Sequence, residues 1–232
     1  MSEPEFDKYA AAYEEIHRRN IRASGENPAY FHEYKIADVA RVVRRGGRPA
    51  GRILDFGSGI GNSLPYWRRY FPAAHLVCAD RSPRSIEFAE ARYPGVAEHV
   101  LLRGAILPFP DQSFDLVFAA CVFHHISVAE HSTWLSEMRR VSRPGGSLFV
   151  FEHNPLNPLT VAAVRNCAFD PAAVLIRSRV LRQRVAAAGW QRAAVRYRIF
   201  FPHFLAFMRP LEACLVWLPL GAQYYVLAEA PA

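Results

Sequence analysis

Between residues 52 and 151 the sequence alternates short apolar runs with stretches of helical periodicity, and this alternation constrains the fold more than any other feature. The apolar runs occupy residues 52–56, 75–80, 100–103, 114–120 and 147–151. The run at 114–120 is almost wholly apolar, which is typical of a strand covered on both faces. Strands that alternate with helices in this way predict βαβ units and a doubly wound parallel sheet, so the expected fold class is α/β.

The two ends of the chain follow a different pattern. Residues 5–45 carry apolar and aromatic side chains every three to four positions, and a turn at 24–28 divides them into two predicted helices. Near the other end we expect a helix at about 178–188, a strand near 195–201, an apolar helical segment and a last strand at 223–228. A last strand that lies directly beside its predecessor would run antiparallel to it.

A glycine-rich loop follows the first predicted strand. Gly57, Gly59 and Gly61 alternate with other residues, which lets the backbone turn tightly and approach a ligand closely. Asp55 precedes the loop, where a carboxylate would repel a pyrophosphate but suits an ammonium group. Asp80 ends the second strand, where an acid accepts hydrogen bonds from ribose hydroxyls in nucleotide-binding α/β folds. The expected ligand therefore has a ribose and a cationic amino acid end without phosphate, and S-adenosylmethionine has that chemistry.

Three further segments extend this pattern in order. They are Leu107–Val117 (LPFPDQSFDLV), Val122–Ile126 (VFHHI) and Arg139–Gly146 (RRVSRPGG). With the glycine loop they make residues 50–152 resemble the class I S-adenosylmethionine-dependent methyltransferases, specifically the type 11 group. The resemblance implies a Rossmann-like, seven-stranded and mostly parallel sheet with helices on both faces, an antiparallel last strand and an N-terminal helical lid. It also implies one domain over 1–232, with the lid at 1–48, a cofactor-binding half at 49–152 and a substrate-side half at 153–232.

The resemblance also implies which residues contact the cofactor. The glycines and Ser58 would line its amino acid and ribose, Asp55 would lie under the loop, and Asp80 would hold the ribose diol. The remaining expected cofactor contacts are Arg81, Gly104, Ala105 and Cys121. Where the family carries an acid for the adenine amino group, this chain has Arg103. Either a backbone carbonyl near Gly104 accepts from adenine instead, or the alignment shifts by one residue.

Candidate catalytic residues follow the fourth strand, at the edge where ligands bind in such sheets. His124 or His125 could remove a proton from a hydroxyl acceptor at neutral pH. The alternative is that one ring packs under the cofactor while the other caps a helix.

Candidate acceptor contacts come from the lid and from the end of the fifth strand. Tyr9, Tyr30 and Tyr34 lie in the predicted lid, and His153 and Asn154 follow the fifth strand. The structural alternatives are helix packing for the tyrosines and an Asx turn ahead of Pro155 for the others.

The charge of the chain indicates which kinds of partner it could bind. The chain has 28 basic and 21 acidic residues, a net charge of +7, which permits contact with phosphates or anionic lipid. Residues 171–211 contain eight arginines and no acid beside many aromatic residues, and this run fits a solvated face, a peripheral membrane contact or a site for a phosphorylated or lipid-linked acceptor. No RNA-binding module is recognisable, so nucleic acid is not expected as a partner.

The spacing of the cysteines bears on metal binding. The four cysteines are more than forty positions apart, so we expect no metal site. The N-terminus lacks a signal-peptide pattern, which favours the cytoplasm.

The sequence therefore predicts an S-adenosylmethionine-dependent methyltransferase that acts on a small-molecule acceptor, with oxygen favoured over nitrogen or carbon. The fourth strand lacks the Asn/Asp-Pro-Pro-Tyr/Phe run with which similar enzymes hold nucleobase or glutamine amino groups. The acceptor could be apolar or lipid-linked. An alternative is a catalytically silent cofactor-binding or scaffolding protein of the same fold. A nicotinamide-dependent oxidoreductase is disfavoured by the glycine spacing and by Asp55.

Overall fold

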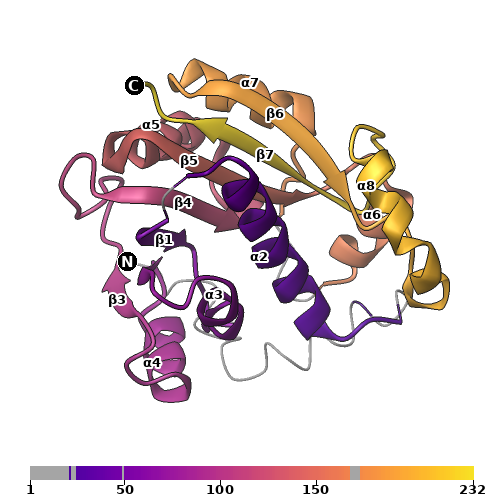
Figure 1. Cartoon of the computed structure of the whole chain (residues 1–232), viewed down its shortest axis with the longest axis horizontal. Helices are drawn as coiled ribbons and strands as arrows, with labels where there is room; N and C mark the ends of the chain where they lie inside the picture. The colour runs from indigo at the N-terminus through magenta and orange to yellow at the C-terminus, as the bar shows by residue number, and fades with distance from the viewer. Residues whose placement is uncertain (1–20, 22–24, 49, 168–172) are drawn as a thin grey trace.

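The computed structural model describes residues 21, 25–48, 50–167 and 173–232. Seven strands form one sheet in the order β3-β2-β1-β4-β5-β7-β6 (Figure 1). They are β1 (Arg52–Phe56), β2 (His75–Asp80), β3 (Glu98–Leu101), β4 (Phe114–Ala120), β5 (Ser142–His153), β6 (Gln191–Arg198) and β7 (Gln223–Glu229). Strands β1 to β5 pair in parallel, while β7 runs antiparallel between β5 and β6. The predicted α/β class, the Rossmann-like sheet and the antiparallel last strand are confirmed.

Helices cover both faces of this sheet. On one face lie α2 (Pro28–Arg45) and α3 (Leu64–Tyr70), and on the other lie α5 (His131–Val141) and α7 (Ser178–Ala187) (Figure 1). Helix α4 (Pro83–Arg92) packs against β2 and β3.

Adjacent strand residues enter opposite cores because side chains alternate across a strand. Ile53 packs with α2 and α3, whereas Leu54 packs with α5 and α7. Leu116 and Val117 divide in the same way on β4. Burial on both faces explains why these strands read as continuous apolar runs.

Local signals account for several helix boundaries. Ser82 accepts a hydrogen bond from the Ser85 amide and Pro83 opens α4, as the sequence predicts. Helix α6 (Pro158–Arg165) was not predicted, although Asn157 caps it by accepting from the Thr160 amide and Pro158 stands in its first turn. The Asn-Pro pair at 157–158 is therefore the sequence signal for the start of α6.

Other boundaries moved by a few residues. Strand β3 begins two residues before the predicted start at 100. Strand β5 begins at Ser142 rather than at 147 because Ser142 already pairs with Phe114, and the Arg143–Gly146 turn lies at an irregularity before Ser147 pairs with Leu116. After β6 the apolar segment forms the 3₁₀ stretch η5 (His203–Leu211) and the short helix α8 (Glu212–Leu215). The first half of the predicted lid, including Tyr9, lies outside the described residues.

The topology brings the carboxyl ends of β1, β4 and β5 to the edge at which β7 begins. The strand order reverses between β1 and β4, because after β1 the chain adds β2 on one side, whereas after β4 it adds β5 on the other side. Ligands of open α/β sheets bind in the crevice at this point. Within the described residues, no helix is long and apolar enough to cross a bilayer.

Candidate active site

The glycine loop leaves β1 with a backbone conformation that other residues rarely adopt. Gly57 has φ +71°, and a Cβ there would lie 2.4 Å from Cγ2 of Val122, so a side chain has no room. Gly59 has φ +53°, and a Cβ there would meet nothing within 4 Å. Gly61 also has a positive φ. The loop is thus closely packed on its inner side at Gly57 and open at Gly59, which fits a ligand that lies against the backbone.

Asp80 holds the loop in place. Its Oδ2 accepts from the Gly59 amide at 2.8 Å, and its Oδ1 accepts from the Ser82 amide at 2.8 Å. A carboxylate offers about four acceptor sites, so two hydrogen bonds to the backbone are compatible with further hydrogen bonds to a ribose diol. The structure therefore brings Asp80 and Gly59 together, as the sequence predicts.

Asp55 lies buried beneath the loop. Its Oδ2 accepts from Nε1 of Trp67 at 2.8 Å. Burial raises the pKa of Asp55 to about 7, against the hydrogen bond from Trp67, which favours the ionised form. A cationic group placed beside this carboxylate would offset the cost of burying its charge. The position thus fits an ammonium-bearing ligand.

The other predicted cofactor contacts lie around the ends of β2 and β3. Ser58 is half-buried in the glycine loop, and Arg81 is exposed directly after Asp80. After β3, Gly104 is exposed with φ +83°, and Ala105 is half-buried. The Leu102 amide donates to the Asp80 carbonyl at 2.8 Å, so this loop starts beside the end of β2.

The LPFPD segment that follows is fixed by helix α5. Glu137 accepts from the Leu107 amide at 2.9 Å. Arg140 donates to the carbonyls of Leu107 and Phe109, at 2.9 Å each, and to Asp111 at 2.7 Å. These contacts hold the segment that follows the predicted cofactor contacts Gly104 and Ala105.

Three histidines gather where β4 and β5 end. Nδ1 of His124 lies 2.6 Å from Oε2 of Glu152, and both side chains are buried. The ring of His125 lies 4.1 Å from that of His124 between centroids, and the ring of His153 lies 5.2 Å away on another side. The structure thus brings together both predicted catalytic residues and one predicted acceptor contact.

Glu152 supports this cluster from below. Its Oε1 accepts from the Phe123 amide at 2.8 Å. Although burial opposes ionisation, His124 and the amide outweigh it and lower the pKa of Glu152. The carboxylate is therefore ionised at neutral pH and can stabilise positive charge on the imidazole rings.

A second polar group lies beside the histidines. Lys35 of α2 is buried, and its Nζ lies 3.8 Å from Sγ of Cys121, a residue with φ +59°. Burial raises the pKa of this thiol, but Lys35 and His153 outweigh it and lower the pKa to about 7. Gln223, at the start of β7, accepts from the Tyr34 hydroxyl and lies 3.3 Å from Nδ1 of His153. A cation, a polarised thiol and an amide therefore face the histidine cluster.

The residues that the sequence predicts for the site do not include Lys35, Glu152 or Gln223. Glu152 stands next to His153 at a strand end, and that position was the available signal. Lys35 and Gln223 come from elements at opposite ends of the chain, so no local pattern links them to the site.

The remaining predicted acceptor contacts separate in the structure. The ring of half-buried Tyr30 lies 4.3 Å from the Arg209 guanidinium and packs beside Tyr34, and burial raises its pKa to about 12. Asn154 points inward instead. Its amide donates to the carbonyls of Pro219 (3.1 Å) and Gly221 (2.8 Å), and its Oδ1 accepts from the Leu156 amide as an Asx turn does. The side chain of Asn154 therefore forms the Asx turn given as its structural alternative, and we leave it out of the proposed site.

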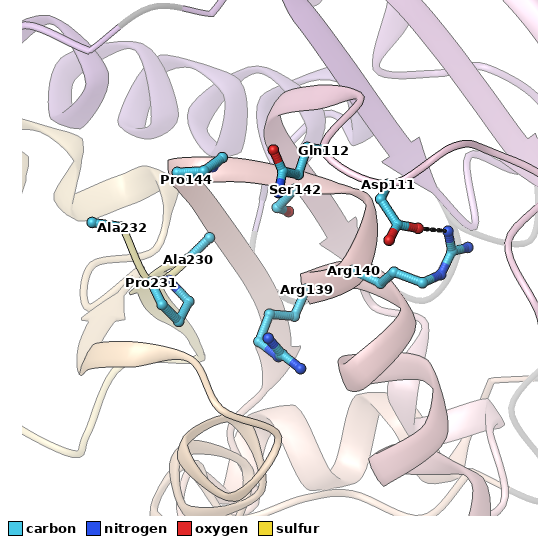
Figure 2. A pocket seen from close by; sticks show the side chains of 9 residues that line it. All are labelled: Asp111, Gln112, Arg139, Arg140, Ser142, Pro144, Ala230, Pro231 and Ala232. Carbon is cyan, nitrogen blue, oxygen red and sulfur yellow. Dashed lines mark hydrogen bonds and ion pairs between the residues drawn. The ribbon is translucent and has the colours of Figure 1, made fainter.

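A hollow of about 370 Å³ lies elsewhere, at the amino end of β5 (Figure 2). Its lining includes Arg139, Arg140, Ser142 and Pro144, and Arg140 is engaged by Asp111. The hollow is at the opposite end of the parallel strands from the glycine loop, so we do not assign the reaction to it. Among the described residues, no cluster of His, Cys, Asp or Glu side chains could hold a metal ion.

Comparisons with known proteins agree with this geometry. The family described as a methyltransferase domain matches residues 54–150. The malonyl-(acyl-carrier protein) O-methyltransferase of Methylococcus capsulatus is 28% identical over 178 residues, which cover 74% of this chain and 64% of that protein. The ubiquinone/menaquinone biosynthesis C-methyltransferase UbiE of Hahella chejuensis is 33% identical over 129 residues, 53% of this chain and 51% of that protein. The aligned region thus spans about half to two thirds of the length of these relatives.

A solved structure extends the likeness to the whole fold. The protein determined in complex with the Haloferax volcanii Trm112 methyltransferase activator superposes with a TM-score of 0.69 at 19% identity, covering 100% of both chains. The strand order, the glycine loop and the acid at the end of β2 define the Rossmann-like methyltransferase fold. Residues 54–150 thus match the methyltransferase-domain family, and the chain has the fold of the class I S-adenosylmethionine-dependent methyltransferases.

The raised pKa of Asp55 leads to a prediction for cofactor affinity. Below a pH of about 7 the buried carboxyl is protonated in the free protein, and a cationic ligand must displace that proton. Affinity for S-adenosylmethionine is therefore expected to rise with pH, by up to about tenfold per unit, and to level off above that pKa. Titration calorimetry across this range measures the effect. Asp55→Asn, which still accepts from Trp67, should bind more weakly and without this dependence; a wild-type affinity that does not change with pH would contradict the prediction.

Proposed function

We propose that the protein transfers a methyl group from S-adenosylmethionine to an oxygen of a small-molecule acceptor, with His125 as the base that takes the acceptor's proton. The observation that carries the proposal is the buried His124–Glu152 pair at 2.6 Å, beside which the half-buried ring of His125 lies 4.1 Å from the His124 ring between centroids. A base that gains a positive charge in the reaction is stabilised by an anion close to it, and Glu152 supplies that anion.

The residues of the chain divide the work. The glycine loop, Asp55 and Asp80 would hold the cofactor, which supplies an activated methyl group and leaves as S-adenosylhomocysteine. His124 and Glu152 orient the His125 ring. Lys35 places a buried positive charge near the same edge and would favour an acceptor oxygen that becomes negative as its proton leaves. Positioning of the reacting groups supplies most of the remaining rate enhancement.

The names of the relatives do not fix which atom of the acceptor is methylated. One relative is by name an O-methyltransferase and another a C-methyltransferase, so both atom types occur among similar chains. A buried carboxylate–imidazole pair supports an acceptor that must lose a proton, and a hydroxyl is the simplest such group. The aromatic and basic residues near the site support an apolar or lipid-linked small molecule.

Calorimetry with S-adenosylmethionine and S-adenosylhomocysteine tests the cofactor half of the proposal. Removal of the Asp80 carboxylate should weaken binding by about 10–100-fold, because hydrogen bonds to a charged group are lost. Asp80→Asn keeps one amide oxygen as acceptor and should lose less affinity than Asp80→Ala. NADH serves as the rival ligand. Absence of binding to either sulfur compound would contradict the proposal.

The acceptor half is tested by S-adenosylhomocysteine release over a panel of hydroxylated, enolic and amine compounds. Turnover confined to hydroxylated members is the expected result. Turnover confined to amines, or binding without turnover on any member, would contradict oxygen methylation; the second result would favour the catalytically silent alternative.

A further inference from the structure

Large apolar side chains are exposed at one end of the molecule. They belong to α6, η5 and the segment between α8 and β7, and the most exposed are Leu159 (77%), Phe204 (76%), Phe207 (78%) and Trp217 (68%), with Leu211 (53%) and Leu220 (58%) in the same elements. We call these six side chains the apolar surface. Exposed aromatic and aliphatic side chains at this density indicate an interaction site.

Hydrogen bonds join the parts of this surface. Asn157, the cap of α6, donates to the Leu220 carbonyl at 2.8 Å, and Thr160 donates to the Ala222 carbonyl at 2.9 Å. Helix α8 continues directly from η5 and packs against it. Figure 1 shows α6 and α8 at the same end of the molecule. The surface is therefore one region rather than scattered residues.

In η5 and α8, charged side chains point into the protein and apolar side chains point outward, which is the opposite of an ordinary surface segment. Glu212 is buried and accepts from the amides of Phe200 (3.0 Å) and Ile199 (3.3 Å). Arg209 also points inward, where it pairs with Glu26 and lies over the Tyr30 ring. The charged residues thus anchor the segment to the protein while the phenylalanines face outward. Such an arrangement exposes apolar area at a cost, and that cost is recovered when the area leaves water.

The stretch of sequence that carries most of this surface is strongly basic. Between residues 153 and 222 the sequence contains nine arginines and two acids. One acid is the buried Glu212, and the other, Asp170, lies outside the described residues. Exposed arginines in this part of the chain include Arg165, Arg177 and Arg196. Arg165 lies on α6 with Leu159, and exposed apolar side chains with arginine on the same helix complement an anionic lipid headgroup layer over acyl chains. Three of the six side chains are leucines, which cannot stack on bases, so the surface as a whole fits lipid better than RNA.

We infer that the apolar surface docks the protein onto anionic phospholipid membranes, with the phenylalanines and Trp217 inserting between headgroups and the arginines contacting phosphates. The surface adjoins Tyr30 of α2 through Arg209, so docking would place the acceptor side of the site near the bilayer. The inference goes beyond methyl transfer, and its test reads binding alone.

Co-sedimentation with vesicles tests the inference. The full chain should bind vesicles of equal parts phosphatidylcholine and phosphatidylglycerol, bind phosphatidylcholine alone much more weakly, and lose affinity as salt rises. The double variant Phe204→Ser with Phe207→Ser should bind the anionic vesicles at least about tenfold more weakly, because two apolar side chains no longer enter the bilayer. Both positions are exposed, so melting temperatures should match the wild type.

Phe88→Ser is the matched control, because Phe88 is a partly exposed phenylalanine on α4 near the β3 edge. It should bind vesicles as the wild type does. The inference is overturned if the wild type does not bind anionic vesicles, or if the double variant binds them as well as the Phe88→Ser control. It is also overturned if single-stranded RNA is bound more tightly than vesicles and displaces the protein from them.

Discussion

Replacement of His125 by alanine is expected to lower kcat by about 10²–10⁴-fold on a hydroxyl acceptor, the range that a general base contributes. The half-buried His125 ring lies against His124, tilted by 46° to it, and Nδ1 of His124 pairs with Glu152 at 2.6 Å. Loss of the ring removes the proposed proton acceptor but leaves the glycine loop and Asp80 intact. Single-turnover kinetics with a hydroxyl acceptor measures the rate, and calorimetry should show unchanged affinity for S-adenosylmethionine.

His75→Ala provides the control for this experiment. His75 is an exposed histidine at the amino end of β2, on the edge of the sheet opposite the site, so its loss should leave kcat unchanged. Full turnover by His125→Ala would remove that residue from the role. A rate loss confined to His124→Ala would transfer the role to His124.

Replacement of Glu152 by alanine is expected to lower the free energy of unfolding by about 3–5 kcal/mol, the cost of breaking a buried ion pair from one side. The variant leaves the buried imidazole of His124 and the Phe123 amide without their carboxylate partner. For a chain of this size the melting temperature should fall by about 2–4 °C per kcal/mol. Urea unfolding followed by circular dichroism measures the loss.

The pH dependence of this loss has a definite sign. Because the pKa of Glu152 is lowered in the folded protein, its contribution is present above the ordinary glutamate pKa and disappears as pH falls through the folded value. The stability difference between wild type and Glu152→Ala should therefore shrink in acid. Glu152→Gln, whose one amide oxygen can still accept from the Phe123 amide, should lose less. Glu87→Ala, at an exposed position on α4, should change stability little; an equal loss in that control would contradict the assignment.

The sequence by itself determined the class of fold and the cofactor loop, because both depend on local rules. Alternating burial on the two sheet faces requires continuous apolar strands, and the positive φ values at Gly57 and Gly59 require glycine. The Ser82 cap and the acids that end β1 and β2 are equally local. Short motifs could therefore predict the part of the site that holds the cofactor.

Only the tertiary structure decided how the acceptor side is assembled. Glu152 reaches His124 across 28 positions because β4 and β5 pair in parallel and end at one edge. Lys35 reaches Cys121 across 86 positions because α2 packs over that edge. Asn154 follows Glu152 and His153 directly in the sequence, but its side chain turns inward and donates to a backbone carbonyl. Which polar side chain faces a site and which one satisfies the buried backbone depends on contacts between distant elements, and a one-dimensional pattern does not contain them.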